Sequence, residues 1–187
     1  MTTTRLEAFS DGVFAILITI MVLELGKPKT PTWHDLKEAL PHIGIYALSF
    51  VTLGIYWANH HHMFHVVDRV NGAVLWTNLN LLFWISLIPY MTAWLGDEGL
   101  KPVPATAYGA ALFASSFSFF FLNTALIRAN GRDSRCAKVL GDDSKGKLST
   151  AIYVVAIPLA YFWPPAGMAL YVITAALWFV PDRRMEN

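Results

Sequence analysis

An acidic residue opens the first apolar stretch of this chain, within the sequence Phe-Ser-Asp-Gly-Val-Phe-Ala-Ile at positions 9 to 16. No charged residue occurs from Val13 to Leu23, and Thr19 is the only polar side chain there. A carboxylate at the start of an apolar segment costs free energy unless a polar group pairs with it. Asp11 is therefore expected either to cap the helix or to belong to a polar network.

Two later segments supply partners for this network. The sequence Trp-Ala-Asn-His-His-His-Met-Phe-His ends the second apolar stretch at His65, and Trp-Thr-Asn-Leu-Asn follows near the start of the third. Both segments lie at the depth of Asp11 if the three stretches cross a membrane in turn. We expect one buried layer in which every polar group is satisfied, made of Ser10, Asp11, Trp57, His60 and Asn78.

The histidines also have the spacing of metal ligands. His61 and His65 are four residues apart, so both imidazoles can reach one ion from a single face of a helix. No third ligand lies near them in the sequence. We therefore predict no metal site, and no other cofactor is implied.

Composition and hydropathy define the elements that must position these residues. Of the 187 residues, 55% are hydrophobic and 14% are charged, against roughly 25% charged in soluble domains. A membrane helix needs about 20 apolar residues, and six segments qualify or come close. They run over residues 6–25, 43–64, 73–95, 105–129, 148–163 and 166–180. The sequence predicts a single all-α domain over residues 1–187, with six transmembrane helices in the cell membrane and in contact with lipid.

Charge distribution predicts the orientation. If the N-terminus is cytoplasmic, ten basic residues lie inside: Arg5, Arg69, Arg128, Arg132, Arg135, Lys138, Lys145, Lys147, Arg183 and Arg184. Four lie outside: Lys27, Lys29, Lys37 and Lys101. The positive-inside rule then places both termini in the cytoplasm. A net charge of +1 gives no reason to expect a nucleic-acid partner.

The first segment has two distinct faces when it is drawn as a helix with about 100° per residue. Ser10 and Asp11 point toward neighbouring helices. The other face carries Phe9, Gly12, Ile16, Thr19, Ile20 and Leu23. An apolar face of this kind is usually covered by lipid or by protein, and a hydrophobic constriction in a pore is the alternative.

Three motifs resemble those of the transmembrane protein 175 family of lysosomal potassium channels and their bacterial relatives. The first is Arg5-x-x-x-Phe9-Ser10-Asp11-Gly12, followed by an apolar helix. The second is Trp57-x-x-His60-x-x-x-Phe64, and the third is Asn78-Leu79 with Pro89 eleven residues after the asparagine. They cover the first half of the chain in matching order and spacing.

The resemblance implies a potassium-preferring cation channel, not an enzyme, in which the first helix of each subunit lines the pore. Bacterial members carry one six-helix repeat and assemble as homotetramers. By distance from Asp11, apolar constrictions fall on Ile16, Ile20 and Leu23, and a polar layer linked to selectivity falls on Thr19. A structural polar network beside the pore helix falls on Arg5, Phe9, Ser10, Asp11, Trp57, His60 and Asn78.

The main alternative is a proton-coupled secondary transporter or a metal-ion exporter that uses Asp11 and the histidine cluster. Transporters often carry internal repeats and interrupted helices, and the sequence has neither in evident form. The residues therefore favour the channel.

Overall fold

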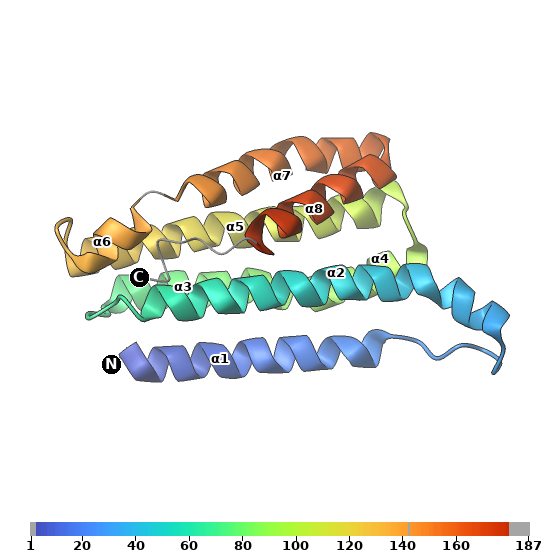
Figure 1. Cartoon of the computed structure of the whole chain (residues 1–187), viewed down its shortest axis with the longest axis horizontal. Coiled ribbons are helices and arrows are strands. Elements are labelled where there is room, and N and C mark those ends of the chain that lie inside the picture. Colours follow the sequence, from blue (N-terminus) through green and yellow to red (C-terminus); the bar gives the residue numbers. More distant parts are fainter. Residues whose placement is uncertain (1–2, 142, 180–187) are drawn as a thin grey trace.

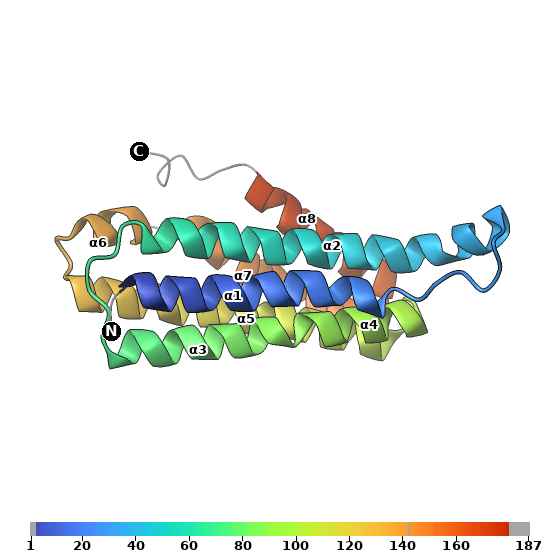
Figure 2. The same cartoon turned by 90° about the horizontal axis from the view of Figure 1, so that it is seen from below.

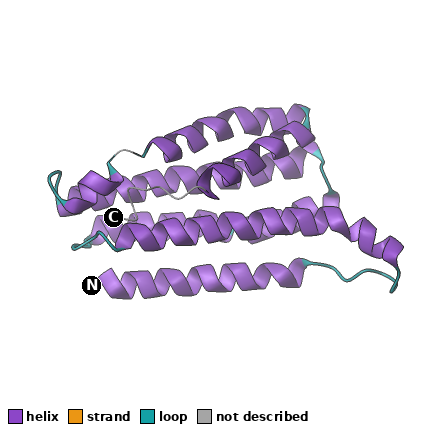
Figure 3. Ribbon diagram, viewed as in Figure 1, coloured by secondary structure: helices purple, strands orange, loops and turns teal. Residues whose placement is uncertain are grey.

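The computed structural model describes residues 3–141 and 143–179, and within these ranges the chain is helical, with no strand (Figures 1 and 3). The elements are α1 (Thr3–Ile20), the 3-10 helix η1 (Met21–Glu24), α2 (Trp33–Phe64), α3 (Gly72–Ser86), α4 (Ile88–Glu98), α5 (Pro102–Asn130), α6 (Arg135–Leu140), α7 (Ser144–Phe162) and α8 (Pro164–Phe179). The all-α prediction is confirmed for these residues.

Among the described residues, four stretches are long and apolar enough to cross a membrane, judged by length and composition: Thr3–Glu24, Trp33–Phe64, Gly72–Glu98 and Pro102–Asn130. Pro164–Trp178 forms a shorter apolar helix. The last predicted segment ends at residue 180, and Arg183 and Arg184 follow it. These three positions lie outside the described residues.

Local chemistry explains where the helices differ from the predicted segments. α2 begins at Trp33 rather than Ile43, because the Thr32 side chain accepts a hydrogen bond from the Asp35 N–H at 3.3 Å and caps the helix. The third segment is interrupted at Leu87, between α3 and α4. Pro89 has no N–H to continue the α-helical ladder there.

The short helix α6 was not predicted, since it lies in a polar stretch between two longer helices. Ser134 accepts a hydrogen bond from the Ala137 N–H at 3.1 Å and begins this helix. Cys136 on α6 is buried, and burial raises the pKa of its thiol to about 11. The thiol is therefore protonated at neutral pH and is a poor nucleophile.

The long helices run side by side, with successive connections at opposite ends of the bundle (Figures 1 and 2). The start of α1, the α2–α3 connection and α6 lie at one end. The α1–α2 connection and the α7–α8 turn lie at the other. Helix α1 is at the edge of the bundle, where it contacts α2, α3 and α4. In Figure 2 it lies in front of the other helices, and no described helix covers its near side.

A buried hydroxyl cluster fixes the helices behind α1. The Ser49 hydroxyl on α2 lies 3.0 Å from the Tyr108 hydroxyl on α5 and 2.7 Å from that of Thr92 on α4. On α5, a Cβ atom at Gly109 would lie 1.9 Å from the Tyr171 hydroxyl of α8. A larger residue at position 109 would therefore displace the Tyr171 ring.

Candidate functional site

The two faces of α1 have opposite environments. Leu6, Ser10, Phe14 and Met21 are each at most 2% exposed, since they pack against the neighbouring helices. The other face is open: Ile16 is 63% exposed and Leu23, which lies in η1, is 77% exposed. The remaining residues placed on that face by the helical wheel, Phe9, Gly12, Thr19 and Ile20, are also exposed. No described helix covers this large apolar strip, and an exposed apolar surface of this kind marks a place where lipid or another molecule binds.

The Thr19 hydroxyl is oriented by its own helix. Its Oγ1–H can donate to the Ala15 carbonyl at 2.8 Å and to the Ile16 carbonyl at 3.1 Å. A hydroxyl has one proton to donate and two lone pairs to accept with. With the proton used within the helix, the oxygen of Thr19 is left as an acceptor on the uncovered face.

The packed face of α1 carries a directed chain of buried hydrogen bonds. Ser10 Oγ donates to the Leu6 carbonyl at 2.9 Å, and Asn78 Nδ2 donates to Ser10 Oγ at 3.0 Å. The Asn78 Oδ1 is then left to accept from His60 Nε2 at 2.8 Å. His60, Asn78 and Ser10 are all completely buried. The chain therefore places a proton on His60 Nε2, and it joins α1, α2 and α3.

Asp11 lies outside this buried chain. Its Oδ1 accepts a hydrogen bond from Trp57 Nε1 at 3.0 Å, with Asp11 half-buried and Trp57 43% exposed. The sequence suggested one buried layer of five residues, and the structure divides it into a buried chain and a more exposed Asp11–Trp57 pair. A rotation of about 100° between consecutive helical residues separates Ser10 from Asp11. Arg5 and Phe9 are exposed on the same helix.

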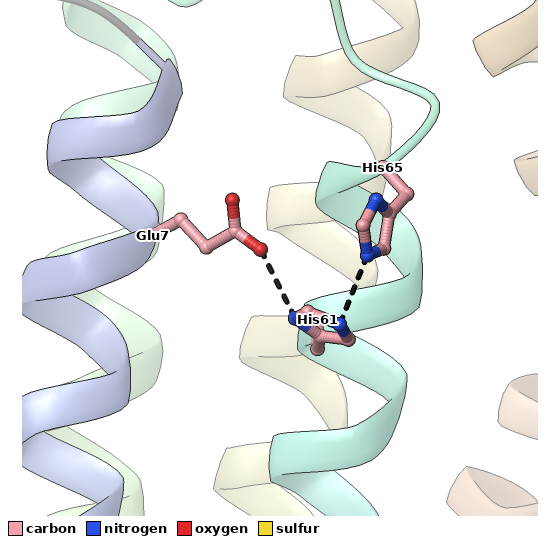
Figure 4. Close-up of side chains that lie close together, drawn as sticks. All are labelled: Glu7, His61 and His65. Atoms are coloured by element: carbon pink, nitrogen blue, oxygen red, sulfur yellow. Dashed lines mark hydrogen bonds and ion pairs between the residues drawn. The ribbon is translucent and has the colours of Figure 1, made fainter.

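Sequence reasoning missed Glu7, which faces the histidines of α2. Its Oε1 lies 3.0 Å from His61 Nδ1, and His61 Nε2 lies 2.9 Å from His65 Nε2 (Figure 4). Glu7 is four residues before Asp11, and His61 is four residues after Trp57. Adjacent antiparallel helices bring successive turns together in this way, so the Asp11–Trp57 pair is the signal that could have located Glu7.

Comparison with known proteins places this arrangement in a family. The family model described as "Endosomal/lysosomal potassium channel TMEM175" matches residues 5–89. A potassium channel of Chryseobacterium sp. (strain P1-3) is 43% identical over 187 residues, which is 100% of this chain and 97% of the relative. An endosomal/lysosomal proton channel TMEM175 of Gallus gallus is 31% identical over 66% of this chain and 28% of its own length.

A solved structure agrees with the whole fold. The crystal structure of a lysosomal potassium-selective channel TMEM175 homolog from Chamaesiphon minutus superposes with a TM-score of 0.82 and 27% identity. The match covers 95% of this chain and 96% of that one. Sequence, helix order and tertiary arrangement agree, and this multi-pass membrane protein belongs to the TMEM175 family.

Proposed function

We propose that this protein is a potassium-preferring cation channel whose pore is lined by the uncovered face of α1. The observation that carries the proposal is the contrast between the two faces of this helix. One face is packed and hydrogen-bonded, whereas the other presents Ile16, Ile20 and Leu23 with the single hydroxyl of Thr19 among them. The names of the relatives, potassium channel and potassium-selective channel, support the same function.

A pore of this kind needs several copies of the chain. One α1 helix cannot surround a lumen, and its apolar strip is open in the single chain. We infer a homotetramer in which four copies of α1 enclose the ion path. The four Ile16 side chains would form the inner constriction, and those of Ile20 and Leu23 the next two rings.

Six membrane crossings complete this domain, which spans residues 1–187. The four long apolar stretches are joined by α7 and α8, which lie alongside α5 in Figure 1. α7 has 19 residues and α8 has 16, or about 28 Å and 24 Å at a rise of about 1.5 Å per residue. These lengths approach the hydrocarbon thickness of about 30 Å.

Charge supports cytoplasmic termini. The bundle end that holds the start of α1 carries eight basic residues within the described ranges: Arg5, Arg69, Arg128, Arg132, Arg135, Lys138, Lys145 and Lys147. Four occur toward the other end: Lys27, Lys29, Lys37 and Lys101. The more basic end faces the cytoplasm by the positive-inside rule.

Conduction follows from the side chains on the open face. Apolar rings resist wetting, so they limit ion flow without any charged group. Just beyond Ile16, the outward oxygen of Thr19 offers a dipole to a partly dehydrated cation. Potassium loses hydration water more easily than sodium, so a few weak dipoles favour it. The buried chain through Ser10 holds α1 at a fixed rotation, which keeps this face toward the pore.

Potassium flux into liposomes tests the proposal. Purified protein is reconstituted, and flux is followed with a potassium gradient and with a sodium gradient. We expect passive, potassium-preferring flux, and we expect Ile16→Asn to raise it by wetting the constriction. Val154→Asn is the control, because Val154 is an exposed apolar residue on α7.

Two outcomes would overturn the proposal. One is saturable, proton-coupled uptake, which would establish the transporter. The other is wild-type flux in an assembled Ile16→Asn protein, which would remove Ile16 from the ion path.

A further inference from the structure

We propose that Glu7, His61 and His65 form a binding site for a divalent transition-metal ion of the zinc class, between α1 and α2. The three residues come from two helices that the α1–α2 connection joins at the far end of the bundle (Figures 1 and 4). One ligand atom from each residue lies within 4.8 Å of the other two. The sequence alone showed two histidines without a third ligand, and the fold supplies the carboxylate.

The distances suit a small ion. Zinc bound at about 2.0–2.1 Å in a tetrahedron holds its ligand atoms about 3.3 Å apart. The two histidine Nε2 atoms are 2.9 Å apart, whereas Glu7 Oε1 is 3.0 Å from the other ring nitrogen of His61, Nδ1. One imidazole offers one nitrogen to an ion, so the His61 ring or the Glu7 side chain must rotate to bring three ligand atoms onto a common ion. These atoms already lie within 4.8 Å of one another, and the fourth position is left for water.

One polar atom of this cluster lacks a hydrogen bond. His61 Nδ1 is buried, and no hydrogen bond satisfies it among the described residues, although Glu7 Oε1 is 3.0 Å away. The two Nε2 atoms share a hydrogen bond at 2.9 Å, in which one imidazole donates to the other. A cation bound by both imidazoles would replace this bond and take the Glu7 carboxylate as a third ligand, because neutral imidazole and carboxylate are ligands that zinc accepts.

The site is also accessible. The side chains of His61 and Glu7 are 38% and 23% exposed, and His65 is exposed at the end of α2. An ion can therefore enter from the water at this end of the bundle, without passing through the helices. The partial burial of His61 and Glu7 limits competition from water at the bound ion.

A second acidic and histidine group, formed by His34, Asp35 and Glu38, is a weaker candidate. It lies within a single helix, and the side chains of His34 and Glu38 are 79% and 68% exposed. The Asp35 carboxylate already accepts hydrogen bonds from the Thr30 N–H at 2.7 Å and from its hydroxyl at 2.8 Å. Its Oδ2 is therefore engaged at the start of α2, and this group serves as the control.

Calorimetric titration of tag-free, chelator-treated protein in detergent with zinc chloride tests the site. We expect one site per chain with an affinity in the micromolar range or better. Glu7→Gln, His61→Asn and His65→Asn should each weaken binding by about tenfold or more. His62→Asn and His34→Asn should leave this affinity unchanged, because neither residue belongs to the site.

Thermal unfolding provides an independent readout. Zinc that joins α1 to α2 in the folded state should raise the melting temperature of the wild-type protein and of His62→Asn, but not that of His65→Asn. His65 is exposed, so its variant is expected to fold. The proposal is overturned if the wild-type protein binds no zinc, or if Glu7→Gln and His65→Asn bind it as tightly as the wild type. Neither measurement depends on ion conduction, so the site and the channel can fail separately.

Discussion

The packed face of α1 carries a polar network and its open face is mostly apolar. A helix on the surface of a soluble protein usually shows the reverse, with polar residues on the open face. The buried face contains Ser10 and the hydrogen-bonded chain to His60, whereas the open face is mostly apolar. In water this arrangement would be unfavourable. Within a membrane assembly, internal hydrogen bonds fix the rotation of the helix, and apolar side chains are free to face lipid, another subunit or a narrow pore.

The difference between the two faces predicts that substitutions on the packed face change stability and that those on the open face change conduction.

The largest effect is expected for Phe14→Ala. The Phe14 ring is fully buried and lies 5.6 Å from the His60 ring, measured between centroids. Its removal leaves a cavity, which should lower the free energy of unfolding by about 3 kcal/mol. Thermal unfolding in detergent measures this, with the half-exposed Phe9→Ala as the control. Equal losses in both variants would contradict the distinction between the faces.

Ser10→Ala tests the hydrogen-bonded chain on the packed face. The Asn78 amide would lose its acceptor in a fully buried position, which should cost about 1–3 kcal/mol of stability. Thr124→Ala is a matched control, since its hydroxyl is exposed and bonds to the Phe120 carbonyl of its own helix. The same unfolding assay applies, and a Ser10 variant as stable as this control would remove the chain from the stabilising contacts.

Asp11→Asn tests the boundary between the faces and should have a smaller effect. Asn can still accept from Trp57 Nε1 but without the charge, so we expect a loss of about 1 kcal/mol. A buried ion contact would cost about 3–5 kcal/mol when broken, and the half-buried position of Asp11 argues against that range. Melting temperature and size-exclusion elution report the outcome. Wild-type stability with lost ion selectivity would instead place Asp11 in the ion path.

Thr19→Val tests the polar layer on the open face and should leave stability nearly unchanged. The substitution keeps the shape of the side chain and removes the oxygen that points away from the helix. We expect the potassium-to-sodium permeability ratio to fall toward one while potassium flux persists. Reversal potentials under bi-ionic conditions measure the ratio. A ratio equal to that of the wild type would mean that selectivity arises elsewhere.

Much of the fold was predictable from hydropathy and local capping. The apolar segments identified each long helix, because an apolar run of about 20 residues has the length of a helix that crosses the bilayer core. The errors lie where local chemistry outweighs hydropathy: Thr32 extends α2 into a polar region, and Pro89 interrupts the third segment. The helix α6 depends on a serine cap in a polar stretch that carries no hydropathy signal.

The sequence by itself determined the membrane class, the two faces of α1 and the motifs that relate the chain to its family. It determined them because hydropathy, helical periodicity and residue spacing are properties of a local segment. Only the tertiary structure decided that Asp11, next to Ser10, lies outside the buried chain and that His61, next to His60, meets Glu7. Consecutive residues of a helix point in directions about 100° apart, so the partner of each side chain depends on which helix is packed beside it.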